Sequence, residues 1–264
     1  MQLKTEKMIA KKEGGVGWMI FNNPDRRNAM SLDMRQAMAE IFDTYAADDE
    51  VRVLILRGAG GKAFVSGADI SEFKEKRNSA DAEAQYGVAV ADSRRAMLAF
   101  DKPMIAMIEG FCVGGGMATA LDCDIRLASD DSQFAIPAAR LGLAYGYDNL
   151  KQLAAVVGPA YAKQILFTGS RLPASKALEI GLVNDVLPRA ELEETVRAMA
   201  AQIVDNAPLT VKAAKATIGA VYEDESHRDL GRVEALMKTC FDSRDFKEGR
   251  EAFMEKRKPV FQGR

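Results

Sequence analysis

The chain has 264 residues, of which 48% are hydrophobic and 28% are charged, and its formal net charge at pH 7 is −2. This composition is typical of one large globular domain, or a domain with an appendage, that buries a sizeable core. The near-neutral charge and the lack of a long basic run argue against a nucleic-acid partner. Since the first twelve residues lack the apolar segment of a signal peptide, we expect a cytoplasmic protein.

Three further features narrow the class of protein. Cys112, Cys123 and Cys240 are odd in number and widely spaced, so we expect reduced thiols. His227 is the single histidine and no cysteine pair has ligand spacing, so no metal site is predicted. Residues 103–121 are the most apolar stretch, but a glutamate and four glycines favour a buried strand, turn and helix over a membrane span.

The first elements along the chain are a predicted hairpin, a helix and a strand. Residues 8–12 and 16–21 flank a glycine pair, which predicts a β-hairpin. Ser31 is expected to cap a helix, because apolar residues recur after it at helical spacing up to Tyr45. Residues 51–56 are almost continuously apolar, which indicates a central strand covered on both faces.

A loop at residues 62–70 follows the predicted central strand. Asp69 is a natural cap for a short helix, and such a helix start leaves free N–H groups near Ala68. Residues 71–79 are strongly charged and predict a mobile surface segment. A helix with one apolar side is then expected over residues 82–100.

The central feature is a strand that breaks into glycines immediately before a helix. Residues 104–108 form a short apolar run typical of a buried strand, and residues 117–121 suit a buried helix. Between them, Gly114–Gly116 expose backbone N–H groups at the positive end of the helix, where an anion or a developing oxyanion is stabilised. Close packing of the helix against a sheet is the alternative explanation for these glycines.

Strands alternate with helices through the first half of the chain and predict an α/β architecture. After residues 133–136 the pattern becomes helical. The predicted helices cover residues 149–157, 159–167, 174–180, 192–206, 209–221, 229–240 and 243–257. We therefore divide the chain into a core at residues 1–200 and a helical C-terminal region at residues 201–264.

Five segments, taken together, resemble the crotonase superfamily, also called the enoyl-CoA hydratase/isomerase family, over nearly the whole chain. They are Asn-Asn-Pro-Asp-Arg-Arg-Asn-Ala-Met (22–30), Lys-Ala-Phe-Val-Ser-Gly-Ala-Asp-Ile (62–70), Glu-Gly-Phe-Cys-Val-Gly-Gly-Gly (109–116), Cys-Asp-Ile-Arg-Leu-Ala (123–128) and Gly-Leu-Val-Asn-Asp-Val (181–186). The resemblance implies a spiral of ββα units with a helical C-terminal region that builds homotrimers, often paired into hexamers. It also implies an acyl-CoA substrate and no cofactor beyond the CoA moiety.

The resemblance assigns two backbone amides to an oxyanion hole for the thioester oxygen. Carried over by position, the donors are Ala68 and Gly115. This agrees with the analysis of the residues themselves, in which two loops present N–H groups at the start of a helix. The task shared by the family is the stabilisation of a thioester enolate.

The two glutamates that serve hydratases of this family are absent. Their positions are Ala118 and Ala138, and an alanine has no proton to exchange. The usual hydratase mechanism is therefore not expected. Loss of CO2 from a malonyl-type thioester generates an enolate without removing a proton, so a decarboxylase-type lyase is favoured.

Local sequence supports this reaction and leaves alternatives open. Residues 141–145 resemble the segment of methylmalonyl-CoA decarboxylase with the active-site tyrosine, which assigns Tyr145 to orient the substrate carboxylate or to protonate the product. A noncanonical hydratase or isomerase could instead use Asp148, which could equally be a helix cap. A non-catalytic CoA-binding protein would also lack both glutamates.

Six residues are assigned to CoA by the same resemblance. Arg26 and Arg27 lie in a loop that borders CoA in this family, and their guanidinium groups suit phosphates. Lys62 and Phe64 are placed at the adenine end. From the C-terminal helix, Phe253 and Lys256 would reach CoA on the same or a neighbouring subunit.

Overall fold

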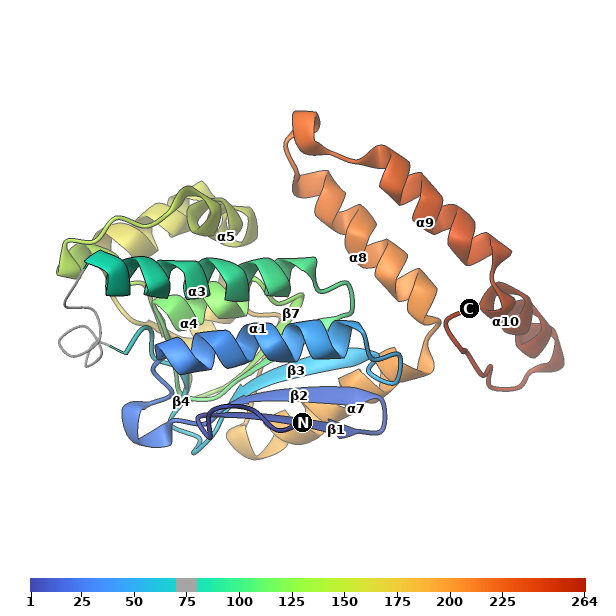
Figure 1. The fold of residues 1–264 in the computed structure, drawn as a ribbon, viewed down its shortest axis with the longest axis horizontal. Coiled ribbons are helices and arrows are strands. Elements are labelled where there is room, and N and C mark those ends of the chain that lie inside the picture. The colour runs from blue at the N-terminus through green and yellow to red at the C-terminus, as the bar shows by residue number, and fades with distance from the viewer. Residues whose placement is uncertain (70–79) are drawn as a thin grey trace.

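The computed structural model describes residues 1–69 and 80–264, and its strands form two sheets (Figure 1). The larger sheet contains β1 (Met8–Glu13), β2 (Val16–Phe21), β3 (Val53–Gly58), β5 (Met104–Ile108), β7 (Ile125–Ser129) and β10 (Asp185–Leu187), adjacent in that order. The smaller sheet contains β4 (Ala63–Val65), β6 (Phe111–Val113), β8 (Gln133–Ala135) and β9 (Leu172–Pro173), also in that order. β1 pairs antiparallel with β2, β8 pairs antiparallel with β9, and the remaining pairs are parallel.

Helices connect and cover these strands. They are α1 (Leu32–Ala46), α3 (Ala80–Ala99), α4 (Gly115–Leu121), α5 (Tyr147–Thr168), α6 (Ala174–Glu179), α7 (Arg189–Asp205), α8 (Pro208–Tyr222), α9 (Leu230–Asp242) and α10 (Arg244–Glu255). Short 3-10 turns lie at Pro24–Arg26, Ala138–Leu141 and Glu225–His227. Within the described ranges, no helix has the length and apolar character required to cross a bilayer.

Most elements predicted from the sequence are confirmed. The hairpin turns at Gly14 and Gly15, whose φ angles of 56° and 87° favour glycine. The predicted helices at residues 149–157 and 159–167 are the two arms of α5, which is interrupted at Gly158 (φ 75°, ψ 161°).

Several expectations need correction or lie outside the described residues. The central strand β3 starts at Val53 rather than at residue 51. Ser31 occupies the N-cap position of α1, but its hydroxyl contacts the Asp33 carboxylate instead of capping the helix backbone. The strands β4, β6, β9 and β10 were not predicted, and β4 lies within the predicted loop at residues 62–70; all four have only two or three residues and lack a long apolar run. The predicted short helix after Asp69 and the mobile segment at residues 71–79 lie outside the described residues.

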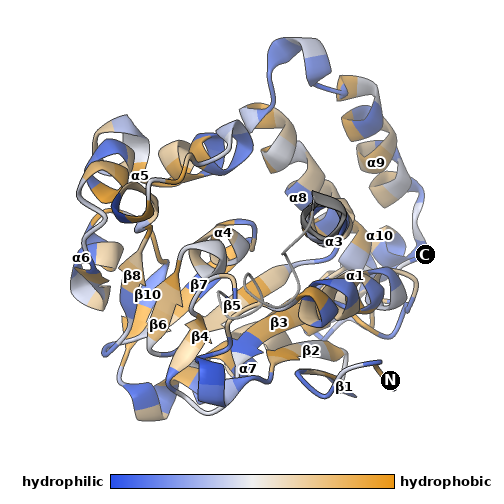
Figure 2. Cartoon of the chain, turned by 60° about the vertical axis from the view of Figure 1, so that its left-hand side comes forward, coloured by the Kyte–Doolittle hydropathy of each residue, from blue (hydrophilic) through white to orange (hydrophobic). Residues whose placement is uncertain are grey.

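Successive side chains along the strands of the larger sheet point to opposite faces, and each face forms a hydrophobic core. One face packs under α1, α3 and α4, and the opposite face packs against α7. Trp18, Ile55 and Ile105 point to the α7 side, while Met19 and Leu56 point to the other side. Figure 2 shows these strands as the hydrophobic centre of the molecule, with hydrophilic residues on the outer surfaces of the helices.

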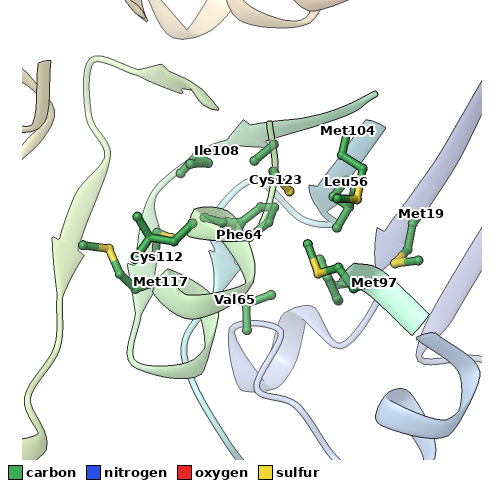
Figure 3. Close-up of a cluster of buried hydrophobic side chains, with 14 of the residues drawn as sticks. Met19, Leu56, Phe64, Val65, Met97, Met104, Ile108, Cys112, Met117 and Cys123 are labelled. Carbon is green, nitrogen blue, oxygen red and sulfur yellow. The ribbon is translucent and has the colours of Figure 1, made fainter. Parts of the chain in front are cut away.

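The short helix α4 is held tightly against β4 (Figure 3). Met117 on α4 and Phe64 and Val65 on β4 are almost fully buried in the same cluster. A Cβ atom on Gly116 would lie 2.0 Å from the Val65 carbonyl oxygen, so no larger residue fits there without moving the helix. This close approach supports the packing explanation for one of the three glycines.

The last three helices extend away from the core (Figure 1). α8 and α9 pack along each other, and the C-terminal tail folds back onto α10, where Asp245 accepts hydrogen bonds from the amides of Gln262 (2.7 Å) and Gly263 (2.8 Å). The domain boundary predicted after residue 200 lies inside α7, which covers the larger sheet.

Replacing Gly116 with alanine should destabilise the protein, because the added Cβ collides with backbone rather than with a movable side chain. We expect the free energy of unfolding to fall by about 1–3 kcal/mol, as for other overpacked cores. Gly219→Ala in α8 is the matched control, since a Cβ there meets no atom within 4 Å. Denaturant unfolding of both variants measures the difference; equal stability of the two would contradict this packing.

Candidate active site

The loop that carries Ala68 is fixed by a parallel bridge to Met30. The Met30 amide donates to the Gly67 carbonyl (2.8 Å), and the Asp69 amide donates to the Met30 carbonyl (3.0 Å). In such a bridge the flanking residues make both hydrogen bonds, so the N–H of Ala68 itself points away from Met30. The N–H of Ala68 is therefore a backbone donor that the bridge to Met30 does not use.

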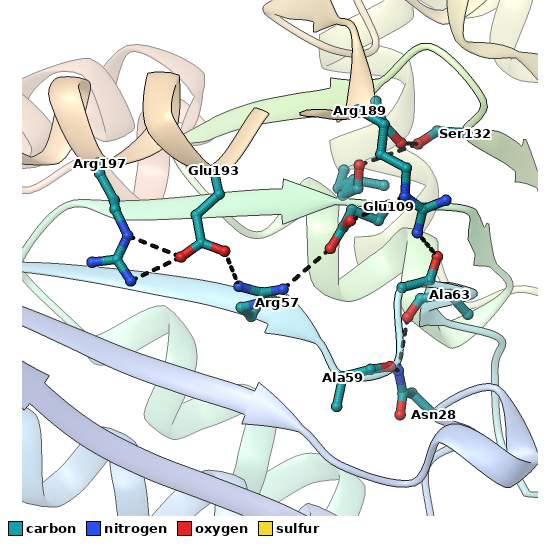
Figure 4. Close-up of polar contacts among 12 residues, drawn as sticks. Asn28, Arg57, Ala59, Ala63, Glu109, Ser132, Arg189, Glu193 and Arg197 are labelled. Atoms are coloured by element: carbon teal, nitrogen blue, oxygen red, sulfur yellow. Dashed lines mark hydrogen bonds and ion pairs between the residues drawn. The ribbon is translucent and has the colours of Figure 1, made fainter. Parts of the chain in front are cut away.

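Asn28 anchors the same region from below (Figure 4). Its side chain is fully buried and donates through Nδ2 to the carbonyl oxygens of Ala59 (3.0 Å) and Ala63 (2.7 Å). Because a buried amide left without partners is costly, this side chain fixes the loop at residues 22–30 against the end of β3 and the start of β4. The position of Ala68 is thus set by elements distant in sequence.

Gly115 begins α4, where the first amides of a helix have no partner within the helix. A Cβ atom on Gly115 would lie 3.9 Å from both the Cα and the carbonyl carbon of Gly67. Gly114 has φ 55° and donates to the Ala135 carbonyl (2.9 Å), which fixes the turn into the helix. The structure therefore brings the loops of Ala68 and Gly115 side by side, while their joint use as oxyanion donors remains a prediction.

A cavity of about 210 Å³ lies beside Gly115. Its described lining residues are Arg35, Met38, Val90, Arg94, Met97, Gly115, Ala118, Thr119, Asp122, Tyr145 and Asn149. Ala118, the first of the two vacated glutamate positions, is part of this wall, and Ala138 is buried. Met38, Val90, Met97 and Ala118 are apolar, but two arginines and an aspartate give the wall an unusual concentration of charge for an acyl pocket.

Arg35 places a positive charge next to Gly115. Its guanidinium Nη2 would be 3.3 Å from a Cβ on Gly115, and only 9% of the residue is exposed. Burial lowers the pKa of Arg35, whereas the nearby Tyr86, Tyr145 and Asp122 raise it. Its Nε is fully buried and has no hydrogen-bond partner in the described part of the chain, which is costly for a charged group, while the same guanidinium interacts with Tyr86.

Tyr145 lies on the cavity wall, and its hydroxyl donates to the Gly114 carbonyl (3.0 Å). Burial raises the pKa of Tyr145 to about 12, so the phenol keeps its proton at neutral pH. In a trans peptide the carbonyl and the N–H point in opposite directions, so this hydrogen bond aims the Gly115 amide away from Tyr145. Tyr145 thus holds the peptide between Gly114 and Gly115, and its contact with substrate stays a prediction.

Asp148 and Asp122 are held by the same arginine but differ in burial. The Asp148 side chain is 75% exposed and lies 3.6 Å from Arg94 Nη1. The Asp122 side chain is only 6% exposed, and its Oδ2 accepts a hydrogen bond from Arg94 Nε (3.2 Å). Burial raises the pKa of the Asp122 carboxyl, and the Arg94 guanidinium opposes that rise. Asp122 is thus the carboxylate that the structure brings into the cavity.

Arg35, Arg94 and Asp122 line the cavity but were not predicted from the sequence. Only Asp122 carried a usable signal, since it follows the vacant position at Ala118 by four residues and so lies on the same helical face. Arg35 and Arg94 come from α1 and α3, and nothing in their local sequence distinguishes them from surface arginines.

The predicted CoA residues divide into three groups. Arg26 and Lys62 are exposed, and Arg27 places its guanidinium 5.1 Å from the centre of the Phe111 ring. Phe64 is fully buried and packs on Phe21, with ring centres 5.4 Å apart. The predicted contact of the Phe64 side chain with adenine therefore does not fit the structure, because all three residues of β4 are buried and this ring packs into the core.

Phe253 and Lys256 lie on α10, far from the cavity within one chain (Figure 1). Phe253 is 82% exposed, and Lys256 ends the helix in a left-handed conformation (φ 56°). Within one chain, neither side chain is brought to the site formed by α1, α3 and α4.

Comparison with known proteins gives a consistent result. The family model described as enoyl-CoA hydratase/isomerase matches residues 11–264. A short-chain-enoyl-CoA hydratase from Clostridium acetobutylicum is 37% identical, with 97% of each chain covered. A crotonyl-CoA hydratase from Syntrophomonas wolfei is 35% identical, covering 97% of this chain and 98% of that protein. The crystal structure of an enoyl-CoA hydratase/carnithine racemase from Magnetospirillum magneticum superposes with a TM-score of 0.90 at 37% identity, covering 99% of this chain and 97% of that one.

The sequence match over almost the whole chain and the close agreement in fold confirm the resemblance predicted from the five motifs. The α/β architecture with its two sheets and C-terminal helices is that of the crotonase fold. The chain belongs to the enoyl-CoA hydratase/isomerase family.

Proposed function

We propose that this protein is a lyase that decarboxylates a malonyl-type CoA thioester through an enolate. The observation that carries the proposal is the alanine at position 118, which lines the cavity next to Gly115. The second vacated position, Ala138, supplies no acid or base either. A site that retains its donor amides but lacks both glutamates suits a reaction whose enolate forms without proton removal.

In this reaction the bond between the α-carbon and the carboxylate carbon breaks, and CO2 leaves. The electron pair of that bond moves onto the thioester, where negative charge gathers on the oxygen between the amides of Ala68 and Gly115. The guanidinium of Arg35 lies beside Gly115 and adds favourable charge in a poorly solvated site. Protonation of the α-carbon then completes the reaction.

CoA recognition is proposed to use Arg26, Arg27 and Lys62, whose exposed cations suit phosphate oxygens. Phe253 and Lys256 are too distant within one chain, so any contact that they make with CoA must be across a subunit interface. Tyr145 is proposed to orient the carboxylate of the substrate, for which its single O–H turns from the Gly114 carbonyl to the carboxylate.

A second candidate function is hydration or isomerisation of an enoyl-CoA by another carboxylate. Two relatives are named as hydratases, and the cavity contains the buried carboxylate of Asp122. Asp148, considered for this role from the sequence, is largely exposed and does not line the cavity. A non-catalytic CoA-binding protein is the third candidate.

Offering purified protein methylmalonyl-CoA and crotonyl-CoA in parallel separates the three candidates. We expect release of CO2 from methylmalonyl-CoA and no addition of water to crotonyl-CoA, because Ala118 and Ala138 cannot activate water. Propionyl-CoA formation by chromatography and the loss of the enoyl absorbance measure the two reactions. Free methylmalonate is the control that shows whether the thioester is required.

Rapid hydration of crotonyl-CoA without turnover of methylmalonyl-CoA would reject the decarboxylase in favour of the second candidate. Binding of both thioesters without turnover of either would support the CoA-binding protein instead.

We further propose that the protein assembles as a homotrimer or as a hexamer of two trimers. The projecting helices expose large apolar side chains that solvent disfavours: Ile218, Val221, Tyr222, Leu230, Met237, Phe241, Phe246, Phe253 and Met254. Helices of this kind need a partner surface, and a second copy of the chain provides one.

Light scattering coupled to size exclusion should therefore give three or six times the mass of one chain. The double variant Val221→Asp, Met237→Asp should dissociate the assembly, since it buries charge in an apolar contact. Val88→Asp is the control, because Val88 is equally exposed but lies on α3. A monomeric wild-type protein, or dissociation by the control alone, would contradict this assembly.

A further inference from the structure

Asp122 is a buried carboxylate that neither the vacated positions nor the family motifs account for. It follows the last residue of α4 and keeps helical backbone angles (φ −77°, ψ −8°). Its amide donates to the carbonyl of Ala118 (3.1 Å), so the two residues are stacked one turn apart on the same face of the helix. Both line the cavity that contains Gly115.

The side chain of Asp122 points towards the start of α4, where Gly115 lies. Bonds from Cα to Cβ tilt towards the N-terminus of a helix, so a carboxylate at position 122 leans back towards Ala118 and Gly115. The side chain of Asp122 therefore lies next to the space that a glutamate at position 118 would fill, on the side towards the C-terminus of α4. Thr119 and Tyr145 close the same wall.

The contacts of Asp122 orient it but leave one oxygen available. Oδ2 accepts a hydrogen bond from Arg94 Nε at 3.2 Å, and Oδ1 accepts none from the part of the chain that the structure describes. Burial raises the pKa of this carboxyl, Arg94 and Arg35 lower it, and Asp148 raises it. A carboxyl with an elevated pKa, fixed by an arginine and open to a cavity, has the properties of a proton-transfer group.

We propose that Asp122 is the catalytic acid that protonates the α-carbon of the enolate. The O–H bond of the carboxyl breaks, and the proton joins the α-carbon. The electron pair of the enolate double bond forms the new C–H bond, and the thioester carbonyl is restored. The carboxylate that remains is paired with Arg94 and regains a proton from water.

This assignment rests on the proposed function only in taking a thioester enolate as the intermediate. The same group run in reverse removes an α-proton from a saturated thioester, whatever reaction first generates the enolate. Exchange of α-protons for deuterium therefore tests Asp122 separately from decarboxylation.

The experiment incubates butyryl-CoA with the full-length protein in D2O and follows deuterium at the α-carbon by mass spectrometry. Wild-type protein should catalyse the exchange, and Asp122→Asn should slow it about 100-fold or more, as expected for loss of a general acid–base group. Affinity for butyryl-CoA should stay within about threefold, because the charge of CoA is held elsewhere. Asp92→Asn is the matched control, since Asp92 pairs with Arg95 on the exposed surface of α3.

Asp122→Ser is a second variant without the carboxylate, in case Asp122→Asn fails to fold as judged by its thermal midpoint. Release of CO2 from methylmalonyl-CoA is measured alongside. Exchange that depends on Asp122 without any CO2 release would support this assignment while rejecting decarboxylation. Wild-type exchange rates in a folded carboxylate-free variant, or no exchange by the wild type, would overturn it and leave Asp122 as a structural partner of Arg94.

Discussion

The site depends on the close contact between the loop at Gly67 and the turn at Gly114 and Gly115. A side chain on Gly116 would strike the Val65 carbonyl, so α4 lies directly against β4. This contact places the backbone after Gly67 next to the first amide of the helix. Since backbone donors held by a rigid fold need no reorganisation, they stabilise a developing oxyanion efficiently. Glycine is thus required at position 116 for packing. The position of the backbone amides at the start of α4 follows from this close packing.

Charged side chains surround that contact in place of the two glutamates that the family resemblance predicts. The positions at which acids are expected are alanines, while a buried arginine and an Arg94–Asp122 pair enter the cavity from α1, α3 and α4. Buried charges are costly even when paired, so three of them on the wall of one small cavity indicate a functional rather than a stabilising role. Arg35 lines this cavity with its guanidinium beside Gly115, so it is suited to an anionic intermediate.

Local patterns were sufficient to predict most of the fold but only part of the site. The hairpin, the buried strands and the C-terminal helices follow from periodicity and glycine signals within a few residues. The strands β4, β6, β9 and β10 do not, because they are too short to show a period and are defined by their partners in the sheets. Phe64 was misassigned because the burial of β4 depends on the helices and strands packed around it. Arg35 and Arg94 become part of the site only when separate helices pack together.

The most direct measurement of the central claim compares Gly115→Pro with Gly115→Ala. Proline suits the first position of a helix but removes the N–H, whereas alanine adds a Cβ at the same place and keeps the donor. We expect Gly115→Pro to lose about 100- to 1000-fold in the kcat for decarboxylation of methylmalonyl-CoA, while Gly115→Ala retains most of this kcat. Both variants should fold and bind CoA. Equal activity of the two variants would contradict a thioester oxygen held by this amide.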